Sequence, residues 1–149
     1  MMRALRRFVR ERDAGPIVEF AVVVPVLLLL LFGIVDFARA FFQRNNLVAA
    51  VREGARFGAV LEFPCAAAGE AAIKSRVTRY FQSVGDSVPA DNTIIVTPNM
   101  AACTAAPDTI TVQIRNYPFK PVTPLFKLLG GNRSIQLQAK AVYRWERAP

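Results

Sequence analysis

Residues 17–35 form an apolar run that contains a single charged side chain, Glu19. As a helix with a rise of about 1.5 Å per residue, the run extends about 28 Å, close to the roughly 30 Å hydrocarbon core of a bilayer. A buried core helix is the alternative, but the rest of a 149-residue chain is too small to surround such a helix on all sides. We therefore expect a transmembrane helix over residues 15–36.

The residues before this run set its orientation. They are mostly basic, with the arginines Arg3, Arg6, Arg7, Arg10 and Arg12. Because positive residues next to a span are retained in the cytoplasm, the pattern predicts a basic cytoplasmic leader over residues 1–14. Residues 37–149 are then expected to form a domain on the outer side of the membrane.

The basic composition, with a net charge of +8 at pH 7, is accounted for in part by this topology. The chain contains no RNA- or DNA-binding motif, so we expect no nucleic-acid partner. Membrane lipid head groups are the expected partners of the N-terminal arginines. The apolar run exceeds the h-region of a secretory signal, and no small-x-small cleavage site closes it, which predicts a retained anchor.

The helical pattern continues beyond the run to about Val60. Apolar residues recur at three- and four-residue spacing, and charges such as Arg39 and Arg44 occupy much of the rest. Pro25 removes one main-chain hydrogen bond inside this helix, so we expect a kink or a local loosening there. Small residues gather in its outer part, where they suit packing against the chain's own sheet or against another subunit: Ala49, Ala50, Gly54, Ala55, Gly58 and Ala59.

The remaining sequence predicts a second helix followed by strands. Residues 66–84 carry an apolar stripe at Ile73, Val77, Tyr80, Phe81 and Val84. Residues 93–97, 109–115 and 134–145 are β-branched or alternate between apolar and polar side chains, and residues 117–133 predict a long connection. We expect an α+β fold, in which the long helix continues into a small domain with a second helix and a three- to four-stranded antiparallel sheet.

The two cysteines, Cys65 and Cys103, both fall in the predicted outer domain. In an oxidising compartment such a pair usually forms a disulfide, and two unrelated buried thiols are the alternative. A bridge would close a loop of about 40 residues and stabilise the domain by up to ~4 kcal/mol in the chain-entropy model.

The side chains that catalysis or a cofactor would need are scarce. The sequence contains no histidine, which removes the commonest general base and metal ligand. The cysteines are too few and too far apart for a zinc site, and no nucleophile-elbow or phosphate-loop motif occurs. Asp86, Asp91 and Asp108 are candidate calcium ligands, although scattered surface acids rarely hold the ion. We expect neither an enzyme nor a cofactor nor a small-molecule substrate.

Glu19 is the candidate functional residue of the apolar run. A charge inside a bilayer costs about 3 kcal/mol unless it lies near the interface or finds a partner, and intramembrane acids are functional candidates for that reason. The simpler interpretation places Glu19 among head groups at the cytoplasmic end, where it also complements the helix dipole. The residue types alone leave both interpretations open.

Three blocks of the sequence resemble the TadE-like family, pilin-like proteins of tight-adherence (Flp, type IVb) pilus systems. The first block covers residues 12–40 and ends on Asp36-Phe37-Ala38-Arg39-Ala40. The second, residues 50–56, is close to the Ala-Ala-Arg-Glu-Gly-Ala-Arg typical of the family and contains Arg52, Glu53, Gly54 and Arg56. The third is the Pro-rich stretch of residues 117–125.

This resemblance implies a minor pilin or pseudopilin, a structural component of pilus assembly in the bacterial inner membrane with a periplasmic C-terminal domain. Its partners would be other pilin-like or membrane-complex subunits, reached through the N-terminal helix. The family-motif residues would serve helix packing: Arg39, Arg52, Glu53, Gly54 and Arg56. A prepilin peptidase would cut between Ala14 and Gly15, which places Glu19 at mature position five, where it neutralises the N-terminal amine of a neighbour.

The sequence departs from the family at this cut, because Ala14 stands where members usually carry Gly. An unprocessed single-span accessory subunit of another membrane complex is therefore the main alternative. A periplasmic small-molecule sensor would need an apolar cavity and a signalling partner, of which the sequence gives no sign.

Overall fold

The fold is described by a computed structural model that defines residues 14–61, 67–99, 108–123 and 134–146. The chain divides into two compact units, one formed by Met1–Ala38 with Val122–Asn132 and the other by Arg39–Pro121 with Arg133–Pro149. The first part of the long helix belongs to the first unit and its later part to the second. The expected division into leader, span and outer domain stays a prediction.

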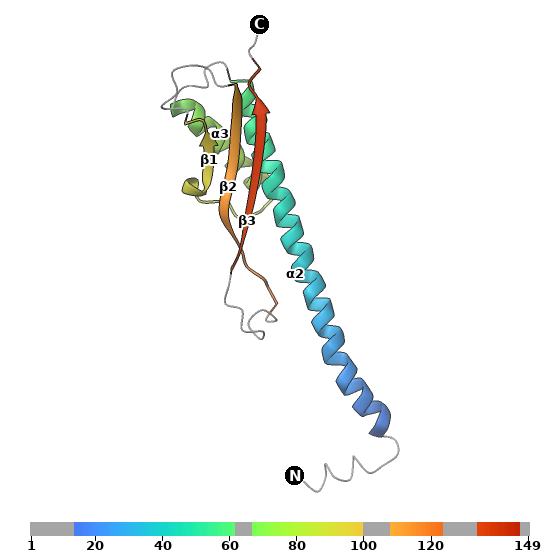
Figure 1. Ribbon diagram of the computed structural model, residues 1–149. Helices are drawn as coiled ribbons and strands as arrows, with labels where there is room; N and C mark the ends of the chain where they lie inside the picture. The colour runs from blue at the N-terminus through green and yellow to red at the C-terminus, as the bar shows by residue number, and fades with distance from the viewer. Residues whose placement is uncertain (1–13, 62–66, 100–107, 124–133, 147–149) are drawn as a thin grey trace. The chain divides into compact units, whose positions relative to one another are not determined.

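Helix α2, Ala14–Ala59, is the longest element (Figure 1). It begins and ends within a few residues of the predicted bounds, which confirms that the apolar run and the amphipathic segment after it form one helix. Pro25 lies inside α2, and the helix is uninterrupted there. The kink that we expect at this proline stays a prediction.

Helix α3, Ala67–Ser83, has the apolar stripe that its sequence predicts. Ile73, Val77 and Phe81 are fully buried, because their spacing of about one helical turn places them on one face. The prediction was wrong for Val84, which follows the last helical residue and is exposed.

The end of α3 is set by Gly85, whose φ of 68° lies in the left-handed region that favours glycine. The Gly85 N–H donates to the Gln82 carbonyl at 3.3 Å, and the Asp86 N–H donates to the Phe81 carbonyl at 3.0 Å. This pair of bonds is a Schellman motif, which satisfies carbonyl groups that the helix itself leaves without partners.

Strands β1 (Ile94–Thr97), β2 (Thr109–Phe119) and β3 (Ile135–Arg144) form an antiparallel sheet in the order β1-β2-β3, with the short 3-10 helix η1 (Asp91–Thr93) before β1. The sheet thus has three strands among the described residues. One boundary prediction was wrong, because residues 117–119 continue β2 instead of opening a long connection.

A β-bulge explains this difference. Ile114 pairs with Ala139 and Tyr117 pairs with Leu137, so two residues of β2 face one residue of β3 between these pairs. Asn116 occupies the bulge with a φ of 57°, a conformation that asparagine adopts more readily than most residues. The extra residue places Tyr117 and Phe119 on the same buried face as Ile114, although simple alternation from Ile114 would place both on the opposite face.

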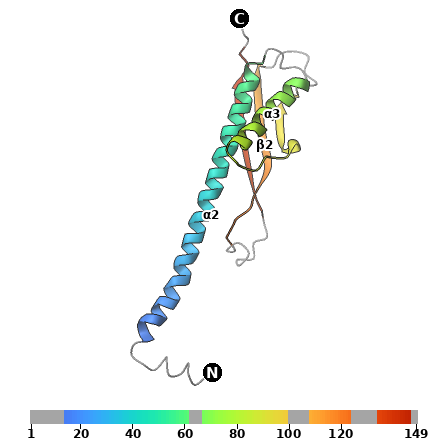
Figure 2. The same ribbon diagram turned by 180° about the vertical axis from the view of Figure 1, so that it is seen from behind.

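The helices cover one face of the sheet in the second unit (Figures 1 and 2). The core contains side chains from α2, α3 and all three strands: Leu47, Ala50, Val51, Ala55, Ile73, Val77, Phe81, Ile94, Val96, Ile110, Val112, Ile114, Tyr117, Ala139 and Ala141. The opposite face carries mostly polar side chains, as expected for an antiparallel sheet with one face in water. The predicted α+β arrangement is confirmed.

Candidate functional site

The apolar part of α2 is the first candidate site. This helix contains a segment long and apolar enough to cross a membrane, and none of its most apolar window is buried within the protein. A core helix of a soluble protein would be mostly buried, so the alternative raised by the sequence does not fit. Apart from Val24, the large side chains of residues 17–35 are exposed and need an apolar environment supplied from outside the chain.

The residues that the sequence singles out at the start of α2 are Ala14, Gly15 and Glu19. Ala14 is the first residue of α2, and a Cβ on Gly15 would meet nothing within 4 Å. Glu19 is exposed among apolar neighbours, without a hydrogen bond or ion pair to any residue that the structure describes. Residues 1–13, which complete the proposed leader, lie outside the described residues.

Asp36 marks the end of the apolar run and is only 4% exposed. Its carboxylate accepts hydrogen bonds from the Val122 N–H at 3.1 Å, the Thr123 N–H at 3.4 Å and the Thr123 hydroxyl. Hydrogen bonds of this kind satisfy the acceptor groups of a buried carboxylate, which is costly to remove from water without partners. Asp36 therefore fastens the end of the Pro-rich block to the helix within the first unit.

Sequence reasoning did not single out this role for Asp36. The sequence feature that could have indicated this role is helical spacing. One face of α2 that is not fully exposed carries, at intervals of three and four residues, Asp36, Ala40, Gln43 and Leu47.

Gly54 and Glu53 of the family motif are used inside the second unit. A Cβ at Gly54 would lie 2.5 Å from the Val77 Cγ2 atom, so only glycine lets α3 approach α2 this closely. Glu53 Oε1 accepts from Nη2 and Nε of Arg76 at 2.7 and 2.9 Å, and the Arg76 guanidinium carbon lies 5.8 Å from the Phe57 ring centroid. The small residues of α2 thus pack against the chain's own helix and sheet.

Arg52, Arg56 and Arg39 are exposed instead. Arg52 and Arg56 are four residues apart and therefore lie one above the other on the outer face of α2. No hydrogen bond or ion pair joins either of them to the residues that the structure describes. The motif accordingly has a packing side and a basic outer side.

A polar cluster joins α2, the end of α3 and β2. The Asn46 amide donates to Asp86 Oδ2 at 3.1 Å, and the Tyr117 hydroxyl lies 3.4 Å from Asp86 Oδ1, 2.6 Å from Ser87 Oγ and 2.8 Å from the Ser87 carbonyl. The Tyr117 ring also stacks on Phe81, with centroids 5.8 Å apart. Tyr117, the first residue of the Pro-rich block, thus fixes the bulged part of β2 against both helices.

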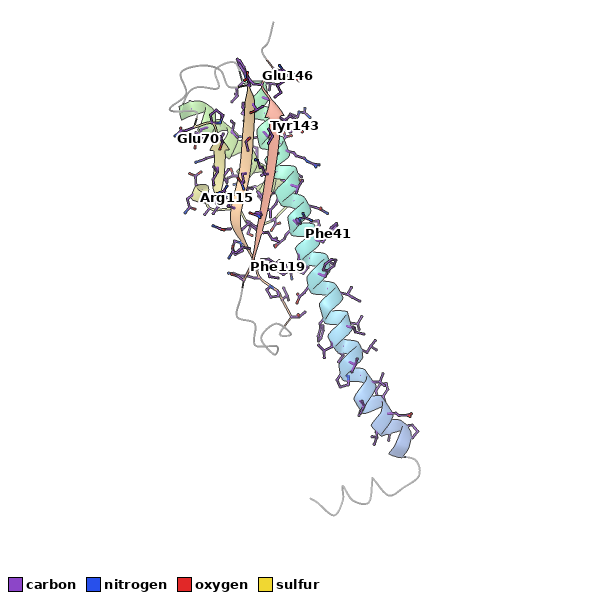
Figure 3. All side chains as sticks on the ribbon, in the orientation of Figure 1. Phe41, Glu70, Arg115, Phe119, Tyr143 and Glu146 are labelled. Carbon is purple, nitrogen blue, oxygen red and sulfur yellow. The ribbon has the colours of Figure 1, made fainter. Side chains whose placement is uncertain are left out.

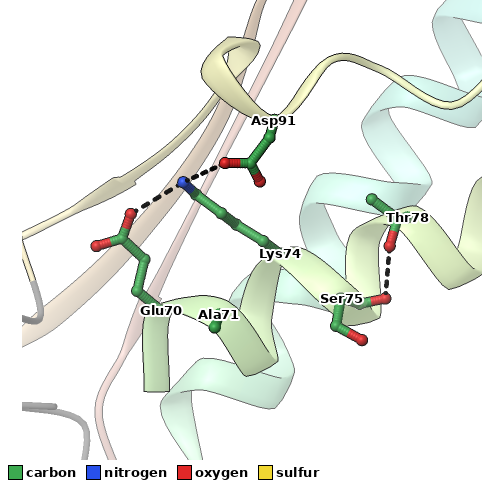
Figure 4. A pocket seen from close by; sticks show the side chains of 6 residues that line it. All are labelled: Glu70, Ala71, Lys74, Ser75, Thr78 and Asp91. Atoms are coloured by element: carbon green, nitrogen blue, oxygen red, sulfur yellow. Dashed lines mark hydrogen bonds and ion pairs between the residues drawn. The ribbon is translucent and has the colours of Figure 1, made fainter. Parts of the chain in front are cut away.

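A shallow hollow beside α3 holds the other charged cluster (Figure 4). Lys74 Nζ lies 3.1 Å from Glu70 Oε1 and 3.2 Å from Asp91 Oδ2. Burial lowers the pKa of Lys74, but the hydrogen bonds and charges of Glu70 and Asp91 outweigh this and raise it overall. Because this lysine is already paired with two carboxylates, the hollow offers little to a charged ligand.

The remaining predicted sites are not brought together. Asp86, Asp91 and Asp108 form no group that could hold a metal ion among the described residues. Cys65 and Cys103 lie outside the residues that the structure describes, so the disulfide stays a prediction.

A long apolar N-terminal helix that carries a second helix and a three-stranded antiparallel sheet defines a pilin-like class of α+β protein. The model of the family described as TadE-like protein matches residues 17–56. This stretch covers the apolar part of α2 and its continuation through Arg56, so it confirms the resemblance for residues 17–40 of the first sequence block and for the second block. Neither the curated proteins nor the solved structures give a match. The TadE-like family is associated with Tad pili and with the cell envelope.

Proposed function

We propose that this protein is a TadE-like minor pilin or pseudopilin, a non-catalytic assembly subunit of a tight-adherence (type IVb) pilus system. Residues 15–36 hold it in the bacterial inner membrane, and residues 37–149 form the periplasmic domain. The observation that carries the proposal is α2 itself, whose apolar window is wholly unburied, while its later part packs into a small sheet domain. The family match covers both parts of this helix.

The division of labour along α2 supports an assembly role. Its packing side is used within the chain, at Gly54 and Glu53, whereas Arg52 and Arg56 are left on the surface. An exposed pair of arginines without a partner among the described residues suits a contact with another subunit, since charged rims set the orientation and the specificity of association.

Glu19 provides the test of assembly. In the proposed filament or membrane complex it neutralises a cation of a neighbouring subunit within the apolar segment, and removing one partner of such a buried pair costs about 3–5 kcal/mol. Glu19→Gln should therefore reach normal membrane levels, because a neutral side chain is easier to insert, but should no longer co-purify with its assembly partners.

Glu146→Gln is the matched control, because Glu146 is exposed at the end of β3 and far along the chain from the apolar run. This variant should recover the partners as the wild type does. Wild-type recovery by Glu19→Gln would mean that Glu19 only lies among head groups, and the pairing mechanism would be wrong.

The alternative, an unprocessed single-span accessory subunit, is favoured by Ala14 at the expected cut. Mass spectrometry of the N-terminus of the native protein distinguishes the processed pilin from the unprocessed accessory subunit. A chain that begins at Gly15 indicates processing by a prepilin peptidase, whereas a chain that retains the arginine-rich leader indicates the accessory subunit.

A further inference from the structure

We propose that Phe41 and Phe42, flanked by Arg39 and Arg44, form an interfacial collar on α2 that docks on phospholipids of the outer leaflet. The inference rests on the proposed membrane span and adds a second lipid contact on the opposite side from the N-terminal arginines. Its occupant is the lipid surface.

The position of the collar along the helix fits the lipid head-group region. At about 1.5 Å per residue, Arg39 and Phe41 lie roughly 6 and 9 Å beyond Val35, the last residue of the apolar run. The interfacial zone on each side of the hydrocarbon core is about 5–8 Å thick. Because side chains on a helix tilt toward its N-terminus, the Phe41 ring reaches back from its backbone position into this zone. Arg44 lies about 14 Å from Val35, and its long side chain reaches back toward phosphate groups.

The positions of the collar residues around the helix axis also fit contact with a lipid surface. At about 100° per residue, Phe41 and Phe42 lie near the middle of the exposed surface of this turn, and Arg39 and Arg44 lie toward its two borders. Phe41 and Phe42 are 54% and 59% exposed, and Figure 3 places Phe41 on α2 away from the strands of the sheet. The packed side of the same turns is formed by Gln43 and Leu47, which are partly and fully buried.

Two exposed phenylalanines on adjacent positions need cover, because they leave a large apolar area in water. The other described phenylalanines of the second unit, Phe57, Phe81 and Phe119, are at least partly buried. Aromatic rings with basic neighbours are typical of membrane interfaces.

Charge favours lipid over a second copy of the chain as the occupant. Arg39 and Arg44 are the only charged residues between positions 37 and 51 of α2. A parallel second helix in register would place arginine opposite arginine, which is repulsive. Anionic phosphates complement both arginines, and each basic residue near an anionic surface strengthens binding about fivefold.

Photocrosslinking in vesicles of phosphatidylcholine and phosphatidylglycerol (3:1) tests the collar. The full chain is made with p-benzoylphenylalanine in place of Phe41, or in place of Val142 as a control. Val142 is 52% exposed on β3, so its exposure matches that of Phe41. We expect lipid adducts from position 41 and at least tenfold fewer from position 142. In an Arg39→Gln/Arg44→Gln background, the ratio of phosphatidylglycerol to phosphatidylcholine adducts should fall at least fivefold.

Flotation of the same vesicles separates failure of the span from failure of the collar. Protein that does not float with lipid after alkaline extraction contradicts the membrane span and with it the collar. Protein that floats, but gives crosslinked dimers or no lipid adduct at position 41, leaves the span intact and overturns the collar.

Discussion

Gly33 and Gly54 lie in the same helix but meet different surroundings. A Cβ at Gly33 would touch nothing within 4 Å, whereas a Cβ at Gly54 would meet Val77 at 2.5 Å. Gly54→Ala should therefore destabilise the domain by about 1–2 kcal/mol, because overpacking outweighs the gain of about 1 kcal/mol in helix propensity. The measurement is denaturant unfolding in detergent micelles.

Gly33→Ala is the internal control, and it should be at least as stable as the wild type, because it gains helix propensity without overpacking. A Gly54→Ala protein as stable as the wild type would show that α2 and α3 do not approach each other as closely as these contacts require.

Tyr117 makes part of the stability depend on alkaline pH. Burial raises the pKa of Tyr117 above its ordinary value of 10.0, the hydrogen bond with Ser87 lowers it, and the neighbouring charge of Asp86 raises it. Since the folded-state pKa is raised, the contribution to stability is complete below about pH 10 and is lost as the pH rises through the folded-state pKa.

Tyr117→Phe should lose about 1 kcal/mol at neutral pH with its hydrogen bonds, and its stability should then fall less steeply above about pH 10. Free energies of unfolding measured across this range test the prediction. Lys74, whose pKa is also raised, is present in both proteins, so the difference between them isolates Tyr117. An equal alkaline slope in the two proteins would contradict it.

At the scale of elements, the bulge in β2 shows where sequence patterns stop being sufficient. The alternation of apolar and polar residues locates Ile110, Val112 and Ile114 on the buried face. The alternation is interrupted after Ile114, so the sequence predicts that the strand ends at Arg115. Asn116 is the extra residue that returns the following side chains to the buried face. It is recognisable only from the register between β2 and β3 and from its backbone conformation.

Deleting Asn116 should turn Tyr117 and Phe119 away from the core. Each buried aromatic side chain contributes about 1.5–3 kcal/mol, so the deletion should cost roughly 3–6 kcal/mol, enough to unfold a small domain. Asn116→Gly keeps the bulge and should change the stability by less than about 1 kcal/mol. Circular dichroism and thermal unfolding of both variants measure the effect, and a deletion variant that melts like the wild type would show that β2 slips without cost.

The helices were predictable for a simple reason. In α3 the periodicity of Ile73, Val77 and Phe81 follows from burial alone. In α2 the apolar run has the length and composition of a membrane span, which the sequence shows directly. The close contact at Gly54, the buried carboxylate of Asp36 and the cluster around Asp86 all join residues far apart in the sequence. Local patterns carry no information about such pairs.

At the scale of the whole molecule, the asymmetry of arginines around the apolar run predicts its topology. A reporter that is active only in the periplasm, fused after Pro149, should be active, because the basic leader is retained in the cytoplasm. A reporter that works only in the cytoplasm serves as the control and should be silent at the same position. The opposite pattern would contradict both the orientation and the expected oxidation of Cys65 and Cys103.

The hydrogen bonds at the end of β3 imply an order of events during synthesis. The Glu146 N–H donates to the Ala59 carbonyl at 3.0 Å, and the Trp145 indole donates to the Leu61 carbonyl at 3.1 Å, next to the end of α2. The apolar part of α2 leaves the ribosome long before these donors, so in the proposed topology it enters the membrane while the domain still lacks its last strand. During that interval β2 has an open edge, which invites association with other chains. In the proposed topology the domain would be tethered at the membrane surface until its last strand is made, instead of diffusing with that edge exposed.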